Sequence, residues 1–207
     1  MFQNHFDKVW VINLEKSEDR LAEFKKQAEF IGLEFDVFPA YDGYGNNIRF
    51  KENNKEYGWN QGAAGLVKTT IDIINDAKAN GYKTVMIFED DSQFNDTTLN
   101  SLNQVMSKVP SNWELIHFCT KHNRPPEWIG KNTARIKSAW MCQAYAISET
   151  VYDELLEHFN KMDRPIDAVT AHTIHPKGNS YCSITKAVTH PINFSTIRLK
   201  VVDYRFE

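Results

Sequence analysis

Residues 85–94 read VMIFEDDSQF, and the change of character within this stretch decides the fold prediction. Its first four residues are apolar and form a run of the length expected for a buried strand. Glu89, Asp90 and Asp91 follow at once. Like charges this close repel one another, and each loses hydration if the strand end is covered. The stretch therefore indicates either a solvated turn, in which Asp90 or Asp91 caps the chain, or a strand end that holds something cationic.

Strand patterns and helix patterns alternate on both sides of this stretch. Short runs rich in apolar and β-branched residues predict strands. The predicted strands are 8–13, 35–40, 83–88, 113–118 and 142–147. Apolar residues at helical spacing, bounded by capping residues and glycines, predict helices. The predicted helices are 18–31, 61–79, 97–108 with Asp96 as its cap, 149–162 and a short one within 164–174.

Strands that alternate with helices are typical of an α/β sheet, so the prediction is one α/β domain over residues 1–207 with a mostly parallel, mixed sheet flanked by helices. No repeat, low-complexity segment or linker divides the chain. Residues 41–60 are rich in glycine, asparagine and aromatic side chains, and they predict a long loop of the kind that is usually functional or mobile. Residues 180–202 alternate in polarity and predict further strands.

Charge and cysteine content bear on the class of protein. The 207 residues carry a formal net charge of −3, and no basic run is longer than two adjacent lysines, so nucleic acid is not an expected partner. Three widely spaced cysteines without a CxxC pair favour a reducing compartment. Neither a signal-peptide pattern nor an apolar run of membrane-spanning length is found, and we expect a cytoplasmic protein with no transmembrane segment.

The acidic cluster has a chemical interpretation. Side chains two residues apart point to the same face of a strand, so Glu89 and Asp91 are expected to project together, with Asp90 on the opposite face. Ligands bind at the carboxyl ends of strands in open α/β sheets. Oxygen ligands with no cysteine or histidine beside them suit Mg²⁺ or Mn²⁺, and such an ion in turn suits a substrate diphosphate.

Six segments in order resemble glycosyltransferase family 25, the lipooligosaccharide and collagen sugar-transferase type. They are VINLEKSEDR, FPAYDG, VMIFEDDSQF, AYAISETVYDELL, RPID and HPINFSTI, which together span residues 8 to about 197. The resemblance implies a GT-A-like, Rossmann-type fold. It also implies transfer of a hexose, galactose or glucose, from a UDP-sugar to a saccharide or glycan hydroxyl with inversion, as in lipopolysaccharide biosynthesis.

The resemblance implies a role for several acidic residues. Asp91, with Glu89, would bind the metal, and an earlier carboxylate of the cluster would approach the ribose. His190 could complete the metal shell or reach the diphosphate, although a lone histidine is more often structural. Asp167 of RPID is the expected catalytic base, since an attacking hydroxyl must lose its proton. The same position near the start of a helix favours an acidic residue for structural reasons alone.

Nucleotide-binding positions are expected beside the acidic cluster. Asn13 ends the first strand and Arg20 lies in the following helix turn, where GT-A folds hold the base. Arg20 could equally pair with Glu23 on a solvated face. Gly43 could line the site or be required by a turn with positive φ. The full set expected to contact the UDP-sugar is Asn13, Arg20, Asp42, Gly43, Gly62, Glu89 and Asp90.

One segment departs from the family pattern, which shows a Gly-Cys-x-x-Ser-His stretch. The matching GAAGLV keeps Gly62 but carries Ala63, Leu66 and Val67. This change raises a second hypothesis, a catalytically impaired relative that binds a nucleotide sugar or glycan. A third hypothesis, a nucleotidyl or phosphoryl transferase, is disfavoured because the chain has no glycine-rich phosphate loop with an adjacent lysine.

Five tryptophans divide into two groups. Trp59, Trp128 and Trp140 fall in or near predicted loops and could either stack on a sugar or pack plainly. Trp10 and Trp113 fall in predicted strands and are expected in the core.

The segment HFCTKH holds His117, Cys119 and His122, a possible soft-metal cluster. The spacing matches no standard zinc pattern. His117 and Cys119 would share one face of a strand and are expected in the core.

Overall fold

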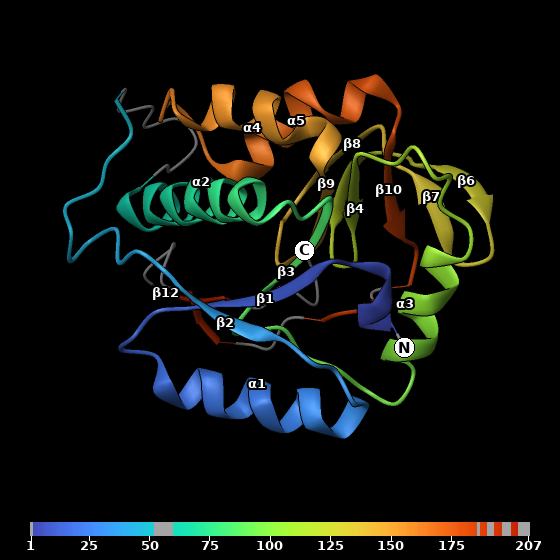
Figure 1. Ribbon diagram of the computed structural model, residues 1–207, viewed down its shortest axis with the longest axis horizontal. Coiled ribbons are helices and arrows are strands. Elements are labelled where there is room, and N and C mark those ends of the chain that lie inside the picture. The colour runs from blue at the N-terminus through green and yellow to red at the C-terminus, as the bar shows by residue number, and fades with distance from the viewer. Residues whose placement is uncertain (1, 52–59, 186, 190–192, 196–199, 203–207) are drawn as a thin grey trace.

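The computed structural model describes residues 2–51, 60–185, 187–189, 193–195 and 200–202. At its centre is a mixed sheet whose described strands follow the order β2-β1-β3-β9-β4-β10-β7-β6. These strands are β1 (Lys8–Asn13), β2 (Asp36–Pro39), β3 (Thr84–Glu89), β4 (Leu115–His117), β6 (Glu127–Gly130), β7 (Thr133–Arg135), β9 (Ala144–Ser148) and β10 (Ser180–Ser183). Figure 1 shows helices on both sides of this sheet, which confirms the predicted α/β class.

Parallel pairing brings together the strands that flank the acidic segment. β1 pairs in parallel with β2 and with β3, so that Ile12 lies opposite both Phe38 and Glu89. β9 runs antiparallel between β3 and β4, and β4 pairs in parallel with β10. Because β1 and β3 are parallel neighbours, Asn13 and Glu89 lie at the same end of the sheet.

The α-helices of the described chain correspond to the predicted ones, but the helix expected over 149–162 is α-helical only over 152–159 and begins with the 3-10 helix η3 (Glu149–Val151). They are α1 (Glu18–Ile31), α2 (Gln61–Asn80), α3 (Thr98–Met106), α4 (Tyr152–Phe159) and α5 (Ile166–Thr173). Gly32 and Gly81 end α1 and α2 with φ of 65° and 70°, the left-handed conformation that glycine adopts without strain. The prediction that Asp96 caps α3 is wrong, because Thr97 holds the N-cap position.

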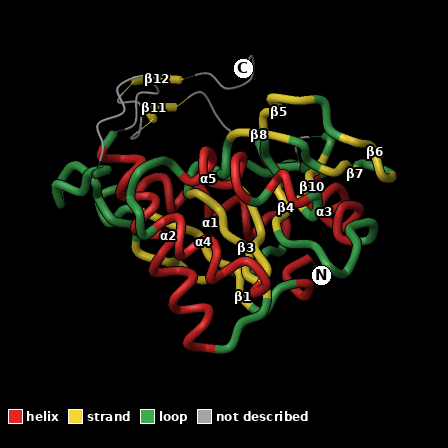
Figure 2. Tube along the Cα trace, turned by 90° about the horizontal axis from the view of Figure 1, so that it is seen from above, coloured by secondary structure: helices red, strands yellow, loops and turns green. Residues whose placement is uncertain are grey.

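The two largest hydrophobic cores among the described residues lie on the two faces of the sheet. Alternation along β1 sends Trp10 and Ile12 to the face covered by α2, α4 and α5, and sends Val9 and Val11 to the face covered by α1 and α3. Figure 2, viewed from above, shows the first group of helices in front of the strands. Trp10 and Trp113 are buried, which confirms their expected place in the core.

The strands between residues 121 and 140 were not predicted. β5 (Lys121–Arg124) and β8 (Ser138–Trp140) form a separate antiparallel pair, while β6 and β7 extend the main sheet. Only Pro125 and Pro126 separate β5 from β6, so the expected loop NRPPEW is shorter than predicted. These strands are three or four residues long and several are mostly polar, so no apolar alternation marks them.

Part of the C-terminal region expected to form strands does so, over 180–183, 193–195 and 200–202. β11 (Asn193–Ser195) and β12 (Lys200–Val202) form an antiparallel pair, and the 3-10 helix η4 (His175–Lys177) precedes β10. No helix in the described ranges has the length and apolar character needed to cross a membrane.

Candidate functional site

The acidic segment leaves the sheet at Glu89, the last residue of β3. Ser92 N donates a hydrogen bond to Glu89 O at 3.0 Å, which closes a turn over residues 89–92. Asp90 and Asp91 are therefore turn residues, and they are 7% and 9% exposed. The prediction that Asp90 points away from Asp91 is wrong, because strand alternation ends where the strand ends.

Arg20 partly neutralises the negative charge of this turn. From the first turn of α1, its Nη2 atom pairs with Asp90 Oδ1 and, at 2.7 Å, with Asp91 Oδ2. Asn13 Nδ2, at the end of β1, donates to Asp90 Oδ2 at 2.6 Å. Hydrogen bonds to charged groups are stronger than neutral ones, so Asp90 is firmly held. The alternative partner of Arg20, Glu23, instead lies 3.8 Å from Lys26.

Burial disfavours the charged forms of these carboxylates. Burial, followed by the charge of Asp91, raises the pKa of Glu89 well above its usual range, against the opposing effect of Arg20. Burial also raises the pKa of Asp90 to about 6, although Arg20 and Asn13 both favour its ionised form. Carboxylates perturbed in this way beside a cavity are candidates for binding cations or moving protons.

A cavity of about 200 Å³ opens beside the turn. It lies at the carboxyl ends of β1 and β3, and the loop after β2 and the start of α2 complete its wall. Its charged lining residues are Lys16, Arg20, Asp42, Glu89 and Asp90. Every residue of the expected nucleotide-binding set lines this cavity except Asn13, which holds Asp90. The structure thus brings together positions that are far apart in sequence, at the end of the sheet where α/β proteins bind ligands.

Two glycines let the loop after β2 approach α2. A Cβ atom on Gly43 would lie 1.7 Å from the backbone oxygen of Gln61, and one on Gly65 would lie 2.6 Å from the backbone oxygen of Tyr41. Tyr41 N also donates to Thr69 Oγ1 at 3.0 Å, which fixes the loop to the helix. Gly43 does not have a positive φ, so the turn-based explanation of this glycine is wrong. Close packing of two backbones requires it.

Lys16 is a cavity residue that the sequence interpretation missed. It pairs with Asp42, and this hydrogen bond is the main reason that the pKa of Asp42 lies below its usual range. Tyr44 N donates to Asp42 Oδ1 at 3.2 Å, so the loop holds the carboxylate in place. Lys16 stands four residues before Arg20, at the junction of β1 and α1. That position, one helical turn before an arginine expected to contact the nucleotide, was the available signal.

The segment that departs from the family pattern forms the start of α2. Asn60 Oδ1 caps the helix by accepting from Ala63 N at 3.1 Å. Gly62 and Leu66 line the cavity, whereas Ala63 and Val67 are buried in the core. A polar side chain at position 66 would face the cavity, and the leucine makes that part of the wall apolar.

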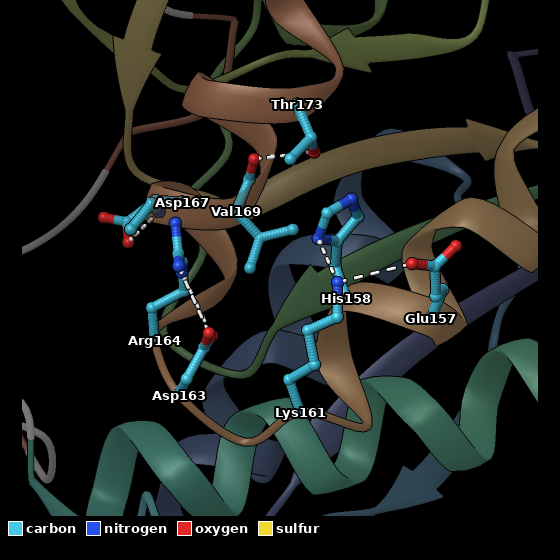
Figure 3. A network of polar contacts seen from close by, with 9 residues as sticks. Glu157, His158, Lys161, Asp163, Arg164, Asp167, Val169 and Thr173 are labelled. Atoms are coloured by element: carbon cyan, nitrogen blue, oxygen red, sulfur yellow. Dashed lines mark hydrogen bonds and ion pairs between the residues drawn. The ribbon is translucent and has the colours of Figure 1, made fainter. Parts of the chain in front are cut away.

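Asp167 lies in the first turn of α5, as Figure 3 shows. Its Oδ1 accepts a hydrogen bond from the next backbone N–H at 2.9 Å, while the neighbouring Arg164 Nε is directed to Asp163 at 3.0 Å. Burial is the main reason that the pKa values of Glu89 and Cys142 are raised, and the charge of Asp167 contributes to both. The candidate base is therefore close enough to the acidic turn to act on it electrostatically.

The expected metal ligands do not form a complete site by themselves. Of the three expected ligands, Asp91 turns one oxygen to Arg20, Glu89 lines the cavity, and His190 lies outside the described residues. Asp90, expected in the nucleotide-binding set, also turns one oxygen to Arg20. In the part of the chain that the structure covers, no three His, Cys, Asp or Glu side chains gather as a metal-binding group. The convergence of two carboxylate oxygens on one cationic atom nevertheless fits a divalent ion that completes its shell with substrate phosphates and water, as Mg²⁺ usually does.

Two of the candidate sugar-stacking tryptophans, Trp128 and Trp140, do not line the cavity. Trp128, on β6, is 58% exposed. Trp140 packs edge-on against His172, with ring centroids 6.1 Å apart. Trp59 falls outside the described residues, and a stacking role for any of the three stays a prediction.

The HFCTKH segment is buried at His117 and Cys119, as expected for core residues. His117 Nε2 lies 3.2 Å from His175 Nε2, a partner that the sequence did not reveal. His122 Nε2 lies 3.6 Å from Cys182 Sγ. These contacts are pairwise, and they do not add up to a metal-binding group within the described residues.

No family model and no curated protein matches the chain. One solved structure that aligns with it is a "crystal structure of a glycosyltransferase involved in the glycosylation of the major capsid of PBCV-1", at 10% identity and a TM-score of 0.45, over 86% of this chain and 94% of that one. Another is "Crystal Structure of A197 from STIV", at 11% identity and a TM-score of 0.44, over 95% of both chains. Likenesses this distant assign neither a family nor an activity, so function has to be inferred from the site.

Proposed function

We propose that the chain is a glycosyltransferase that moves a hexose from a UDP-sugar to a hydroxyl of a saccharide or glycan. The transfer inverts the anomeric centre and is assisted by Mn²⁺ or Mg²⁺. Membership of family 25, galactose or glucose as the sugar, and a place in lipopolysaccharide biosynthesis belong to the same proposal, and the ordered sequence segments support them.

The proposal rests on the cavity, whose lining combines cationic, acidic and apolar side chains at one end of the sheet. Lys16 and Arg20 present cations, which suit a diphosphate. Glu89 and Asp90 present carboxylates, which suit ribose hydroxyls and a metal ion. Ile12 gives an apolar surface for a flat base. A nucleotide diphosphate has a group that suits each kind of lining: the diphosphate, the ribose and the base.

The reaction needs a proton acceptor and a stabilised leaving group. The acceptor hydroxyl oxygen attacks the anomeric carbon while its proton passes to the Asp167 carboxylate. The bond from that carbon to the diphosphate oxygen breaks, and the oxygen keeps the electron pair. Lys16 and Arg20 hold the diphosphate as its charge grows. A divalent cation on Asp90 and Asp91, when bound, would supply further neutralisation of the same charge.

A donor panel tests the proposed activity. The chain is incubated with UDP-glucose, UDP-galactose and other nucleotide sugars, with Mn²⁺ or with EDTA, and slow hydrolysis to free nucleotide is measured. We expect release of UDP from at least one UDP-hexose in Mn²⁺, and a rise in Tm when UDP and Mn²⁺ are added together. No release and no rise with any donor would contradict the proposal.

The role of Asp167 is tested by Asp167→Asn. Loss of a positioned base should lower turnover by roughly 10²- to 10⁴-fold while the Kd for UDP stays the same. Asp163→Asn is the matched control, because Asp163 is a nearby carboxylate that pairs with Arg164. Unchanged turnover in Asp167→Asn would remove this residue from the role.

The apolar wall at Leu66 favours a second candidate function, a module that binds a nucleotide sugar or glycan without transferring it. This candidate predicts a Tm rise with UDP but no UDP release under any acceptor. The donor panel separates the two candidates, since only the enzyme releases nucleotide.

A further inference from the structure

Two carboxylates from adjacent residues converge on a single nitrogen atom. Asp90 Oδ1 and Asp91 Oδ2 both contact Arg20 Nη2. Neighbouring side chains in an extended strand diverge, so the turn that starts at Glu89 is what brings these oxygens together. Oxygen donors that converge on one positive centre are also what a small divalent cation requires.

The carboxylates and the guanidinium are held by separate parts of the chain. Asn13 holds Asp90 from β1, and the hydrogen bond from Ser92 to Glu89 closes the turn, so neither restraint depends on Arg20. The Arg20 side chain is 21% exposed and lines the cavity. Its buried Nε–H has no hydrogen-bond partner within the described residues. The turn can therefore keep its shape when the guanidinium moves.

We propose that Arg20 is an exchangeable counter-ion: it occupies the position between Asp90 and Asp91 that a divalent cation would take, and it competes with that cation. The inference rests on the proposed function, in which the same turn holds a cation beside the diphosphate. A displaced guanidinium stays at the cavity wall with Lys16, where both cations meet the diphosphate. Arg20 then neutralises the turn before the substrate arrives and contacts the diphosphate once the cation has replaced it.

The test is the binding of Mn²⁺ alone, without nucleotide, measured by calorimetry and by the electron paramagnetic resonance signal of free Mn²⁺. Arg20→Ala should bind Mn²⁺ at least about tenfold more tightly than the unaltered chain, because the carboxylates lose a competitor. Arg20→Lys, which keeps a charge but not the planar fork, should fall between them. Arg135→Ala is the matched control. It removes an arginine that pairs with one carboxylate, Glu127, at 3.2 Å, and its Mn²⁺ affinity should not change.

Equal or weaker Mn²⁺ binding by a folded Arg20→Ala chain, checked by circular dichroism, overturns the inference. Should the alanine variant not fold, Arg20→Lys decides, and an affinity equal to that of the unaltered chain again overturns it. The two failures are distinguishable. If the unaltered chain releases UDP from a donor but Arg20→Ala does not bind Mn²⁺ more tightly, the transferase proposal stands and the counter-ion proposal fails. If Arg20→Ala binds Mn²⁺ more tightly but the unaltered chain turns over no donor, the counter-ion proposal stands and the transferase proposal fails.

Discussion

The acidic turn that follows β3 and a buried histidine pair beside β4 are two clusters of like ionisable groups, and they are built in opposite ways. Asp90, at the end of β3, lines a cavity and pairs with Arg20. His117 of β4 and His175 of η4 are 0% and 1% exposed, with their Nε2 atoms 3.2 Å apart, and neither lines that cavity. One cluster faces a ligand-sized space and the other is sealed inside the protein.

This contrast separates a candidate ligand site from a cluster that has a structural role. Burial lowers the pKa of His175 to about 4 and that of His117 well below its usual range, so at neutral pH both rings are uncharged. A neutral buried pair has a sufficient structural explanation. Asp90, with its pKa raised to about 6 by burial, is still ionised at neutral pH, and burial of that charge costs stability. Proteins keep such costly charges mainly where they are used.

Closing the cavity wall should give the largest effect, because the cavity is what separates the two clusters. In Gly43→Ala the new methyl group meets the backbone oxygen of Gln61 at 1.7 Å, and no side-chain rotation can relieve a backbone clash. We expect a loss of about 3 kcal/mol in the free energy of unfolding, with loss of UDP binding as the loop moves off α2. Urea unfolding and UDP titration measure both.

Gly130→Ala is the matched control for that variant, since the nearest atom to its new methyl group is a flexible Lys108 carbon at 3.4 Å. It should change neither quantity appreciably. A Gly43→Ala chain that keeps its stability and its UDP affinity would show that the loop and α2 need not pack this closely.

The histidine pair should make the protein labile to acid. Because the pKa of His175 is about 4 in the folded chain against 6.5 in the unfolded chain, the unfolded chain binds more protons below pH 6.5, and stability falls as the pH drops toward 4. Between pH 7.5 and 4.5 this residue alone should lower the free energy of unfolding by about 2.5 kcal/mol. Urea unfolding at several pH values measures this fall in the free energy of unfolding. The fall should be smaller in His175→Gln than in the unaltered chain or in His172→Gln, an exposed control. A loss of equal size in all three would contradict the prediction.

Asp90 should change stability with pH in the opposite direction to His175. Its pKa is raised from 3.8 to about 6 on folding, so its contribution to stability is present below pH 3.8 and is lost as the pH rises through 6. Between pH 4.5 and 7.5 the loss should be about 2 kcal/mol. The stability of Asp90→Asn relative to the unaltered chain should therefore increase with pH by that amount. If the difference in the free energy of unfolding between Asp90→Asn and the unaltered chain is constant across this range, folding does not raise the pKa of Asp90.

The sequence predicted the elements around the acidic turn because their signals are local. The run before Glu89 reads as a strand by its apolar residues, and Gly32 and Gly81 stop two helices in the way their position suggests. The cavity could be expected as well, since parallel strands bring their carboxyl ends together. Residues 121–140 gave no comparable signal, because their strands are short and lack apolar alternation.

The contacts that give the two clusters their character could not be predicted. Whether Arg20 meets Asp90 and Asp91 depends on where the strand ends and on how α1 is rotated against it, and neither is fixed by a local pattern. The approach of His175 to His117 joins η4 to β4 across the fold. Strand alternation, applied one residue too far, gave the wrong direction for Asp90. Such errors arise where regular structure stops, which is also where the cavity lies.

Lys16→Ala should have the smallest effect and tests the charge of the cavity most selectively. Its side chain is 59% exposed and pairs with Asp42, so its loss should change stability by less than about 0.5 kcal/mol. UDP affinity should fall by about three- to tenfold at low salt, and the deficit should shrink as salt screens the charge. Lys161→Ala removes a similarly exposed lysine, paired with Glu157 at 3.3 Å in the region of Figure 3, and should leave UDP affinity unchanged. If Lys16→Ala binds UDP as well as Lys161→Ala does at low salt, Lys16 does not act on the diphosphate.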